Sequence, residues 1–307
     1  MPLKSRKQVL LSKIETTAGV DSVPVAGTDA MLVQNLKFAP LVVNAQERNL
    51  ATPYFGNDGK VIAGVYGTLE FDVEAAGSGV AGTAPKWGPL MKGCAMSETV
   101  NAGVSVVYAP VSSGEQSLTH YYFVDGVKYA LLYARGSKSL KFSAGSVPMM
   151  HYKFTGLRVA PADLALPTPT LPTIKPVAVN QANTVFTLHG YSGVMQDCDI
   201  DFGEEVKYIN RVNSESVQIV GRKSTGSVTL EKTLLATKNW YGIAEAGTTG
   251  ALSLTHGTVA GNKFKVDGAV VQVSNVEDTE VDGIEMLKLG LEFTWSAGND
   301  ELTVTTL

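Results

Sequence analysis

The sequence predicts a mainly β fold in two halves, and three observations lead to this. Many segments alternate apolar and polar residues with a period of two, as in residues 67–74 (GTLEFDVE), which is typical of a strand with one buried face. Helical candidates are few, with one good stretch in each half. Five prolines within residues 161–176 divide the chain, because proline fixes φ and removes a hydrogen-bond donor.

Strands are expected throughout both halves, wherever β-branched and aromatic residues dominate. In the first half they are residues 104–108, 121–124, 127–133 and 150–159, and in the second residues 198–202, 217–220, 227–230, 252–255, 269–273 and 286–295. Helices are expected within residues 85–96 and 234–246, whereas residues 5–16 fit either a turn or two of helix or an extended segment.

The sequence Val-Asp-Gly occurs once in each half, at residues 124–126 and 266–268. An Asp-Gly pair between two apolar runs is a strong signal of a β-hairpin turn. Asp125 with Gly126 and Asp267 with Gly268 are therefore predicted as equivalent turns.

The order of features predicts a duplicated domain. Gly67 opens Gly-Thr-Leu-Glu-Phe and Gly226 opens Gly-Ser-Val-Thr-Leu; a segment with Trp87 or Trp240 follows, then Val-Asp-Gly and a last strand. We expect a first domain at residues 1–160 with an N-terminal arm and a long loop, a linker at 161–176, and a second domain at 177–307. The linker is expected to be a polyproline-like strut whose ten central residues span roughly 30 Å.

The charge of the chain is small but uneven. The net charge of −4 argues against strong nonspecific binding to nucleic-acid phosphates. Residues 1–160 carry 15 basic and 11 acidic side chains, a net +4, whereas residues 161–307 carry 10 and 18, a net −8. Two halves of opposite net charge would favour head-to-tail association of copies, and neutral drift explains the difference in charge equally well. Neither an apolar signal core nor a membrane span is expected, and two cysteines fit a reducing cytoplasm.

Enzyme and metal signals are weak. Gly77, Gly79 and Gly82 match the spacing of a dinucleotide-binding loop, but no helix opens within the pattern and no βαβ unit surrounds it. Asp197, Asp199 and Asp201 resemble the start of a calcium loop that lacks its glycine and its glutamate; a strand with three aspartates facing water is the better interpretation. The sequence therefore predicts no catalytic, metal or cofactor site and no enzyme.

The N-terminal third contains an ordered set of short motifs at residues 13–19 (KIETTAG), 29–33 (DAMLV), 38–41 (FAPL), 47–48, 67–73, 77–79, 82–87 and 93–95. With these motifs it resembles phage major tail tube proteins, most closely those of siphophages of the Mu-like transposable kind. The resemblance covers about the first 100 residues; the rest is similar in architecture only.

This resemblance implies a structural virion protein of the tail, assembled in the bacterial host cytoplasm. Tandem β-sandwich or half-barrel domains would form stacked rings with a continuous inner β-barrel, through which DNA passes during ejection without specific binding. A tail terminator, a tape-measure protein and a distal tail protein are the expected partners besides the chain itself, with no membrane anchor. If both halves are tube domains, a homotrimer closes a pseudo-hexameric ring; a homohexamer is the alternative, with the second half as a decoration domain.

Two sets of residues follow from this role. The N-terminal arm up to Val33 and the loop at residues 47–60 are candidates for contacts between stacked rings, and acidic strand residues are candidates for the lumen wall, which should repel phosphates. The stacking candidates are Lys13, Glu15, Glu47, Arg48, Gly56, Asp58 and Gly59, and the lumen candidates are Glu70, Asp72, Asp199 and Asp201.

Three other classes stay open on the sequence alone. A carbohydrate-binding or adhesive β-sandwich of a virion or cell surface would show an aromatic platform. A secretion-system tube subunit would usually be shorter and have one domain. A β-sheet hydrolase would need a convergent catalytic set.

Overall fold

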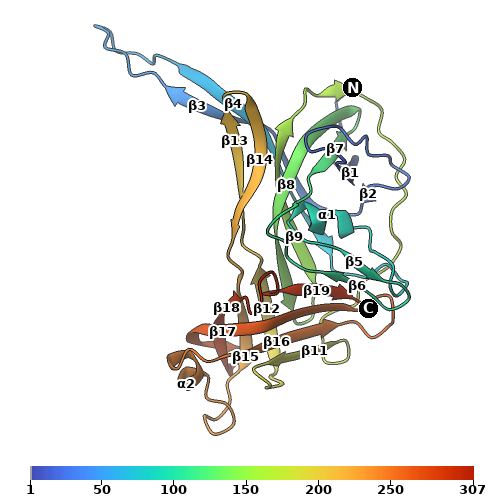
Figure 1. The fold of residues 1–307 in the computed structure, drawn as a ribbon, viewed down its shortest axis with the longest axis vertical. Helices are drawn as coiled ribbons and strands as arrows, with labels where there is room; N and C mark the ends of the chain where they lie inside the picture. Colours follow the sequence, from blue (N-terminus) through green and yellow to red (C-terminus); the bar gives the residue numbers. More distant parts are fainter. Residues whose placement is uncertain (1) are drawn as a thin grey trace.

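The computed structural model describes residues 2–307, which form 19 strands and two short helices (Figure 1). Strands hold 53% of the residues and helices 4%, which confirms the prediction of a mainly β protein. Both helices lie inside the predicted stretches but are shorter: α1 is Gly88–Gly93, with a proline in its first turn, and α2 is Trp240–Glu245.

One antiparallel sheet of eight strands runs through both halves. Its order is β3-β4-β9-β8-β12-β15-β18-β17, so the first half gives four neighbouring strands and the second half the other four. The sheet closes into no barrel within the chain. The bounds are β3 Gln34–Glu47, β4 Lys60–Glu74, β9 Met149–Arg158, β8 Val127–Ser143, β12 Met195–Asp201, β15 Thr225–Glu231, β18 Ile284–Thr294 and β17 Phe264–Val281.

The remaining strands build second layers beside this sheet. In the first half β2 (Ala30–Met31), β1 (Gln8–Ile14) and β7 (Leu118–Val124) pair in that order, and β7 joins the first part of β8. In the second half β11 (Thr184–Leu188) pairs with β16 (Thr249–His256), and β16 joins the first part of β17. β19 (Thr303–Thr306) links β17 to β6 (Ser105–Tyr108), which pairs with β5 (Thr99–Asn101).

The two halves therefore share one connectivity. In each, an outer strand leads to two strands of the eight-strand sheet, then to a short helix, then to another outer strand and to two strands that complete the sheet. The first half has β2 in addition between β1 and β3, and the β5–β6 hairpin between α1 and β7. The equivalent elements are β1 and β11, β3 and β12, β4 and β15, α1 and α2, β7 and β16, β8 and β17, and β9 and β18. A separate hairpin of β13 (Glu204–Arg211) and β14 (Ser214–Arg222) stands between β12 and β15.

The halves are packed together rather than held apart. One hydrophobic core includes Phe71 and Phe142 from the first half and Ile200 and Leu289 from the second. The linker is extended as expected, but it lies along the first half, starting with β10 (Ala162–Asp163), which pairs with β8. The expectation of a spacer between two separate bodies is therefore wrong.

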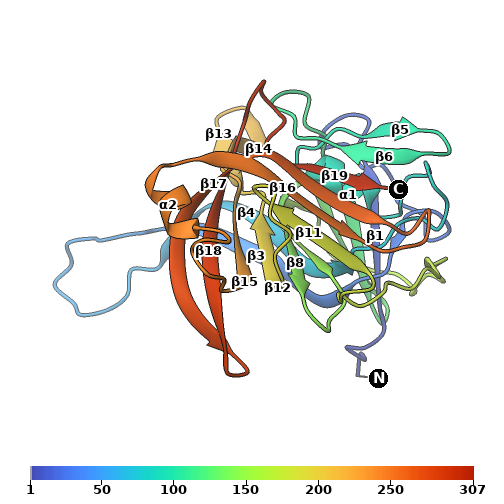
Figure 2. The ribbon, with the colours of Figure 1, turned by 90° about the horizontal axis from the view of Figure 1, so that it is seen from below.

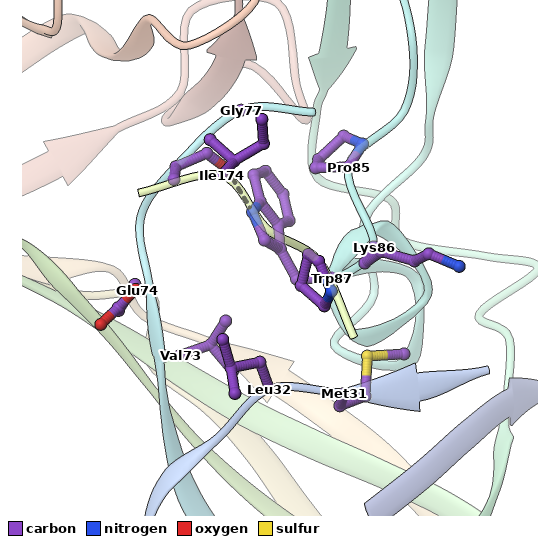
Figure 3. A pocket seen from close by; sticks show the side chains of 11 residues that line it. Met31, Leu32, Val73, Glu74, Gly77, Pro85, Lys86, Trp87 and Ile174 are labelled. Carbon is purple, nitrogen blue, oxygen red and sulfur yellow. Dashed lines mark hydrogen bonds between the residues drawn. The ribbon is translucent and has the colours of Figure 1, made fainter. Parts of the chain in front are cut away.

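The end of the linker lies in a pocket beside Trp87 (Figure 3). Ile174 and Pro172 line this pocket together with Met31 and Val73 of the first half. The indole nitrogen of Trp87 donates a hydrogen bond to the carbonyl of Ala76 at 2.8 Å, which fixes the ring against the linker. The apolar contact anchors the linker before it enters the second half.

Two local predictions need correction. Asp125 and Gly126 form the turn between β7 and β8, both with positive φ, but Asp267 and Gly268 lie inside β17 and make no turn. A Cβ on Gly268 would meet the Phe293 ring at 2.8 Å, so this glycine serves close packing. The N-terminal arm is also no free arm, because β1 pairs with both β2 and β7.

Candidate functional site

The eight-strand sheet has two edges whose backbone groups have no partner strand. Within residues 2–307, β3 pairs with β4 alone. The distal part of β17, residues 273–281, pairs with β18 alone. Unpaired N–H and C=O groups along an edge strand favour pairing with another chain. The two edges lie at opposite ends of the sheet, and Figure 2 shows the β17–β18 hairpin extending away from the body.

A junction of the same kind already exists inside the chain, where the two halves meet. β8 pairs antiparallel with β12, from Ser139 opposite Asp201 to Ser143 opposite Asp197. Leu140 and Ile200 point into the core on one side of this junction. β8 is the equivalent of β17 and β12 is the equivalent of β3, so the two free edges are the counterparts of two strands that pair within the chain.

One face of the sheet is polar, and all four lumen candidates lie on it. Leu69, Phe71 and Val73 alternate with Glu70 and Asp72 on β4 and pack into the core. On β12, the buried Cys198 and Ile200 alternate with three aspartates in the same way. The predicted face of Asp199 and Asp201 is thus the one observed, and Asp72 lines the same open hollow as both of them.

Two of the four lumen candidates have a lysine neighbour across the strands. Glu70 pairs with Lys153 at 2.9 Å and Asp199 with Lys141 at 3.8 Å, and both lysines are exposed. The carboxylate of Asp72 lies 2.7 Å from Nδ1 of His151. The hydrogen bond from Lys153 lowers the pKa of Glu70, whereas partial burial raises the pKa of Asp199. This face therefore carries both acidic and basic side chains, and two of its carboxylates form ion pairs with lysines.

The second feature is an exposed hairpin arm, defined here as residues 43–65 at the ends of β3 and β4 with their loop (Figure 1). Tyr54 is 82% exposed and Phe55 is fully exposed at its tip, and Val61 and Ile62 are exposed on its side. Apolar side chains that are exposed to water do not stabilise a single subunit. A cluster of exposed apolar side chains on one segment therefore indicates an interaction site.

Five of the stacking candidates lie on the hairpin arm. Glu47 and Lys60 form an ion pair at 2.9 Å where the two strands end. In the loop, the carboxylate of Asp58 accepts a hydrogen bond from the backbone N–H of Leu50 at 3.2 Å. Gly59 has a φ of +72°, which suits glycine, while Gly56 has open space around it. Arg48 also lies in this loop and is exposed.

The other two stacking candidates lie elsewhere. Lys13 is half-buried on β1, where its backbone pairs with Thr119. Glu15 is only 6% exposed, and its carboxylate accepts hydrogen bonds from the N–H groups of Gly19 and Tyr133 and from the hydroxyls of Ser117 and Thr119. Glu15 therefore holds its own half together, and its side chain is not free to contact a stacked ring.

The hairpin of β13 and β14 is the counterpart of the hairpin arm in the second half, and it lies against the first half (Figure 1). Its Glu204 forms a fully buried ion pair with Lys138 of β8. Further along, the ring of Tyr208 stacks on Tyr66 of β4 with centroids 4.7 Å apart. Arg135 donates hydrogen bonds to this hairpin as well. One hairpin is thus bound to its own chain, while its counterpart projects.

The glycine loop that resembles a nucleotide site has a packing role that the sequence did not reveal. The N–H of Gly79 donates to the carbonyl of Gly261 in the second half at 2.9 Å. A Cβ on Gly77 would lie 2.1 Å from that same oxygen, so only glycine fits. The loop is a backbone-to-backbone contact between the halves, and no sequence motif signals it.

The His, Cys, Asp and Glu side chains of the described residues are dispersed. Within residues 2–307, no group of three or more His, Cys, Asp or Glu side chains is placed to hold a metal ion. Cys94 and Cys198 are free and buried, and burial raises the pKa of both thiols. Neither of the two helices of this part of the chain is long and apolar enough to cross a membrane.

Two unpaired sheet edges and an exposed apolar hairpin arm are typical of a protein that associates with other chains. A family model described as phage tail tube protein matches residues 5–297, nearly the whole chain, and the chain belongs to this family. No curated protein matches it. The protein is a structural component of a phage tail, not an enzyme.

Proposed function

We propose that this chain is the major tail tube subunit and that three copies close a pseudo-hexameric ring. The eight-strand sheet carries the proposal, because it presents two free edges whose counterparts pair within the chain. Three copies give 24 strands. At about 4.8 Å per strand and a tilt near 40°, the ring has a circumference of roughly 150 Å and a backbone diameter of about 48 Å. After side chains are subtracted, about 40 Å remains, enough for a DNA duplex.

In this proposal each chain holds two tube domains, residues 1–160 and 177–307, joined by the linker at 161–176. The repeated strand order supports a duplication. The alternative, a hexamer of chains whose second half decorates the outside, leaves the pairing of β8 with β12 unused for closing the ring. The finer assignment to siphophages of the Mu-like kind rests on the resemblance of the N-terminal motifs.

The hairpin arm is proposed to contact the neighbouring ring in the stack. Tyr54 and Phe55 at its tip supply apolar area that has no cover in the single chain. Glu47, Arg48 and Asp58 surround this area with charge, which would set the orientation of the contact.

The polar face of the sheet is proposed to line the lumen. Glu70, Asp72, Asp199 and Asp201 would give a mildly acidic wall that repels DNA phosphates, so that DNA passes without specific binding. The paired lysines weaken the negative field of this wall. A tail terminator, a tape-measure protein and a distal tail protein are the proposed further partners, with assembly in the bacterial host cytoplasm.

Microscopy of the purified full chain tests the proposal. Concentrated protein is expected to form discs or tubes in negative stain, and cryo-EM of these is expected to show three chains per disc with 24 inner strands. Native mass spectrometry of isolated discs counts the chains independently. Six chains per disc would refute the trimer, and a protein that stays monomeric at all concentrations would refute the tube.

A further inference from the structure

We infer that the edge of β17 in one copy pairs antiparallel with β3 of the next copy, in the register that β8 and β12 already use within the chain. This pairing places Val281 opposite Ala39 and Thr279 opposite Val42. The inference rests on the proposed ring, and it adds which edges meet, in which direction and at which residues.

The register follows from matching the two halves strand by strand. Gly67 on β4 and Gly226 on β15 open the matching sequences and are taken as equivalent. One residue further, Thr68 pairs with Ala39 on β3, and Ser227 pairs with Asp199 on β12. Ala39 is therefore the equivalent of Asp199.

The other side of the junction is matched in the same way. Two residues after Gly67 and Gly226, the chain pairs with Phe154 of β9 and Leu289 of β18, respectively. These two pair in turn with Gly136 of β8 and Val276 of β17. Both strands then continue without a register shift, so a position five residues further on β8 matches the position five residues further on β17.

These matched positions are Lys141 and Val281. Lys141 faces Asp199 within the chain, so Val281 is expected to face Ala39 between chains. The next outward pair of the in-chain junction is Ser139 with Asp201.

The equivalents of that outward pair are Thr279 and Val42. Tyr66 and Thr225 each precede the matched glycine by one residue, and they pair with Val42 and Asp201, respectively. Val42 follows Ala39 by three residues and not two, because β3 has a register shift between them. A proline in this shift, Pro40, has no N–H to donate and is tolerated at an edge bulge.

The side chains at the inferred contact suit close pairing. Ala39, Val42, Thr279 and Val281 are small or β-branched and half-buried already in the single chain. Such residues favour cross-strand packing. Helix α2 does not obstruct the edge: it stands beside β17 as α1 stands beside β8, and β8 nevertheless pairs with β12.

Charge also favours this pair of edges. The edge of β17 belongs to the acidic half and carries Glu277, Glu280 and Asp282 near its end. β3 belongs to the basic half and presents Lys37 two residues before Ala39. The in-chain junction joins the same two halves and contains the Lys141–Asp199 ion pair. Pairing β3 with a second β3 would forgo this complementarity.

Engineered cysteines in the assembled full chain test the register. Directly opposite residues of an antiparallel pair have Cα atoms about 4.5–5.5 Å apart, within the range that a disulfide spans. The variant Ala39→Cys with Val281→Cys, oxidised with diamide after assembly, is expected to give covalent dimers and trimers on a non-reducing gel, with no larger species because the ring closes. The native Cys94 and Cys198 are fully buried and should not react.

Two controls make the result specific. Ala39→Cys with Asn275→Cys moves one thiol six residues along β17, about 20 Å, and should give no cross-link. Lys141→Cys with Asp199→Cys should close a disulfide within one chain and reports that the oxidation works.

If the wild type forms tubes but the variant Ala39→Cys with Val281→Cys gives no cross-link, the register is wrong and the tube proposal stands. The same holds if the Asn275 control gives an equal yield of cross-linked product. If that variant fails to assemble, Val42→Cys with Thr279→Cys replaces it, and the same readout applies. Wild-type protein that never assembles would overturn the tube proposal and the inference with it.

Discussion

The buried ion pair between Lys138 and Glu204 is expected to be the strongest single electrostatic link between the two halves. Both side chains are almost fully buried, at 1% and 0% exposure. The second carboxylate oxygen of Glu204 accepts the backbone N–H of Lys138 at 3.2 Å, and the ammonium group also donates to the carbonyl of Cys94 at 3.2 Å. Burial raises the pKa of Glu204, while the charge of Lys138 opposes that rise.

Replacing Lys138 by Met removes the cation and leaves the carboxylate in a dry site. Glu204 must then bind a proton in the folded state. At pH 7 this costs about 3.4 kcal/mol for a group whose ordinary pKa is near 4.5. Removing one partner of a buried pair costs about 3–5 kcal/mol in general, which is the same size. At pH 5 the cost of protonation falls to about 0.7 kcal/mol.

Urea unfolding of the unassembled subunit, followed by tryptophan fluorescence, measures both values. The Lys138→Met variant is expected to lose about 3 kcal/mol relative to the wild type at pH 7 and to recover most of this loss at pH 5. The double variant with Met at 138 and Leu at 204 serves as the control and should be near the wild type at both pH values. An equal loss at pH 7 and pH 5 would show that lost packing, not an unpaired charge, causes the effect.

Three further predictions follow from the same structure. Burial lowers the pKa of His120 to about 3, so the folded state keeps this side chain neutral. The unfolded chain binds a proton there below about pH 6.5, so the free energy of unfolding should fall by about 1.4 kcal/mol per pH unit below that value. Urea titrations should show that His120→Leu removes this slope. Gly77→Ala should cost about 2 kcal/mol or more in thermal or urea unfolding through its backbone clash, whereas Gly56→Ala, in open space, should stay within about 0.5 kcal/mol. Tyr54→Ser with Phe55→Ser should leave the melting temperature of the subunit unchanged and abolish tubes in negative stain; normal tubes would remove the hairpin arm from the stacking contact.

Local patterns in the sequence predicted most of the strands. The alternation at residues 67–74 placed Leu69 and Phe71 in the core, and the alternation around Cys198 placed the aspartates on the opposite face. A pattern with a period of two identifies one strand and distinguishes its two faces, and it carries no further structural information. Residues 5–16 were left open between helix and extended chain, and β1 forms there because β7 and β2 flank it.

Contacts between residues that are distant in the sequence were beyond the reach of these patterns. The Asp-Gly pair at 267–268 has the composition of a turn, yet the neighbouring Phe293 ring decides its conformation. Gly77 and Gly79 look like a flexible loop until Gly261 is brought against them. The buried Glu15 looks like a surface charge until four donors surround it. Each of these depends on a residue about 25 to 185 positions away.

The two equivalent hairpins differ in whether they pack against their own chain, and this difference would affect how rings stack. Glu204 and Tyr208 bind the β13–β14 hairpin to the first half, so of these two equivalent hairpins the hairpin arm of residues 43–65 is the one that projects. A ring of three chains would therefore offer three projecting arms, although its inner sheet has six similar units. Contacts between such rings would follow threefold symmetry, while the lumen keeps near-sixfold symmetry. A ring of six chains would offer six arms, so the number of arms in a reconstructed disc reports the stoichiometry independently of the strand count.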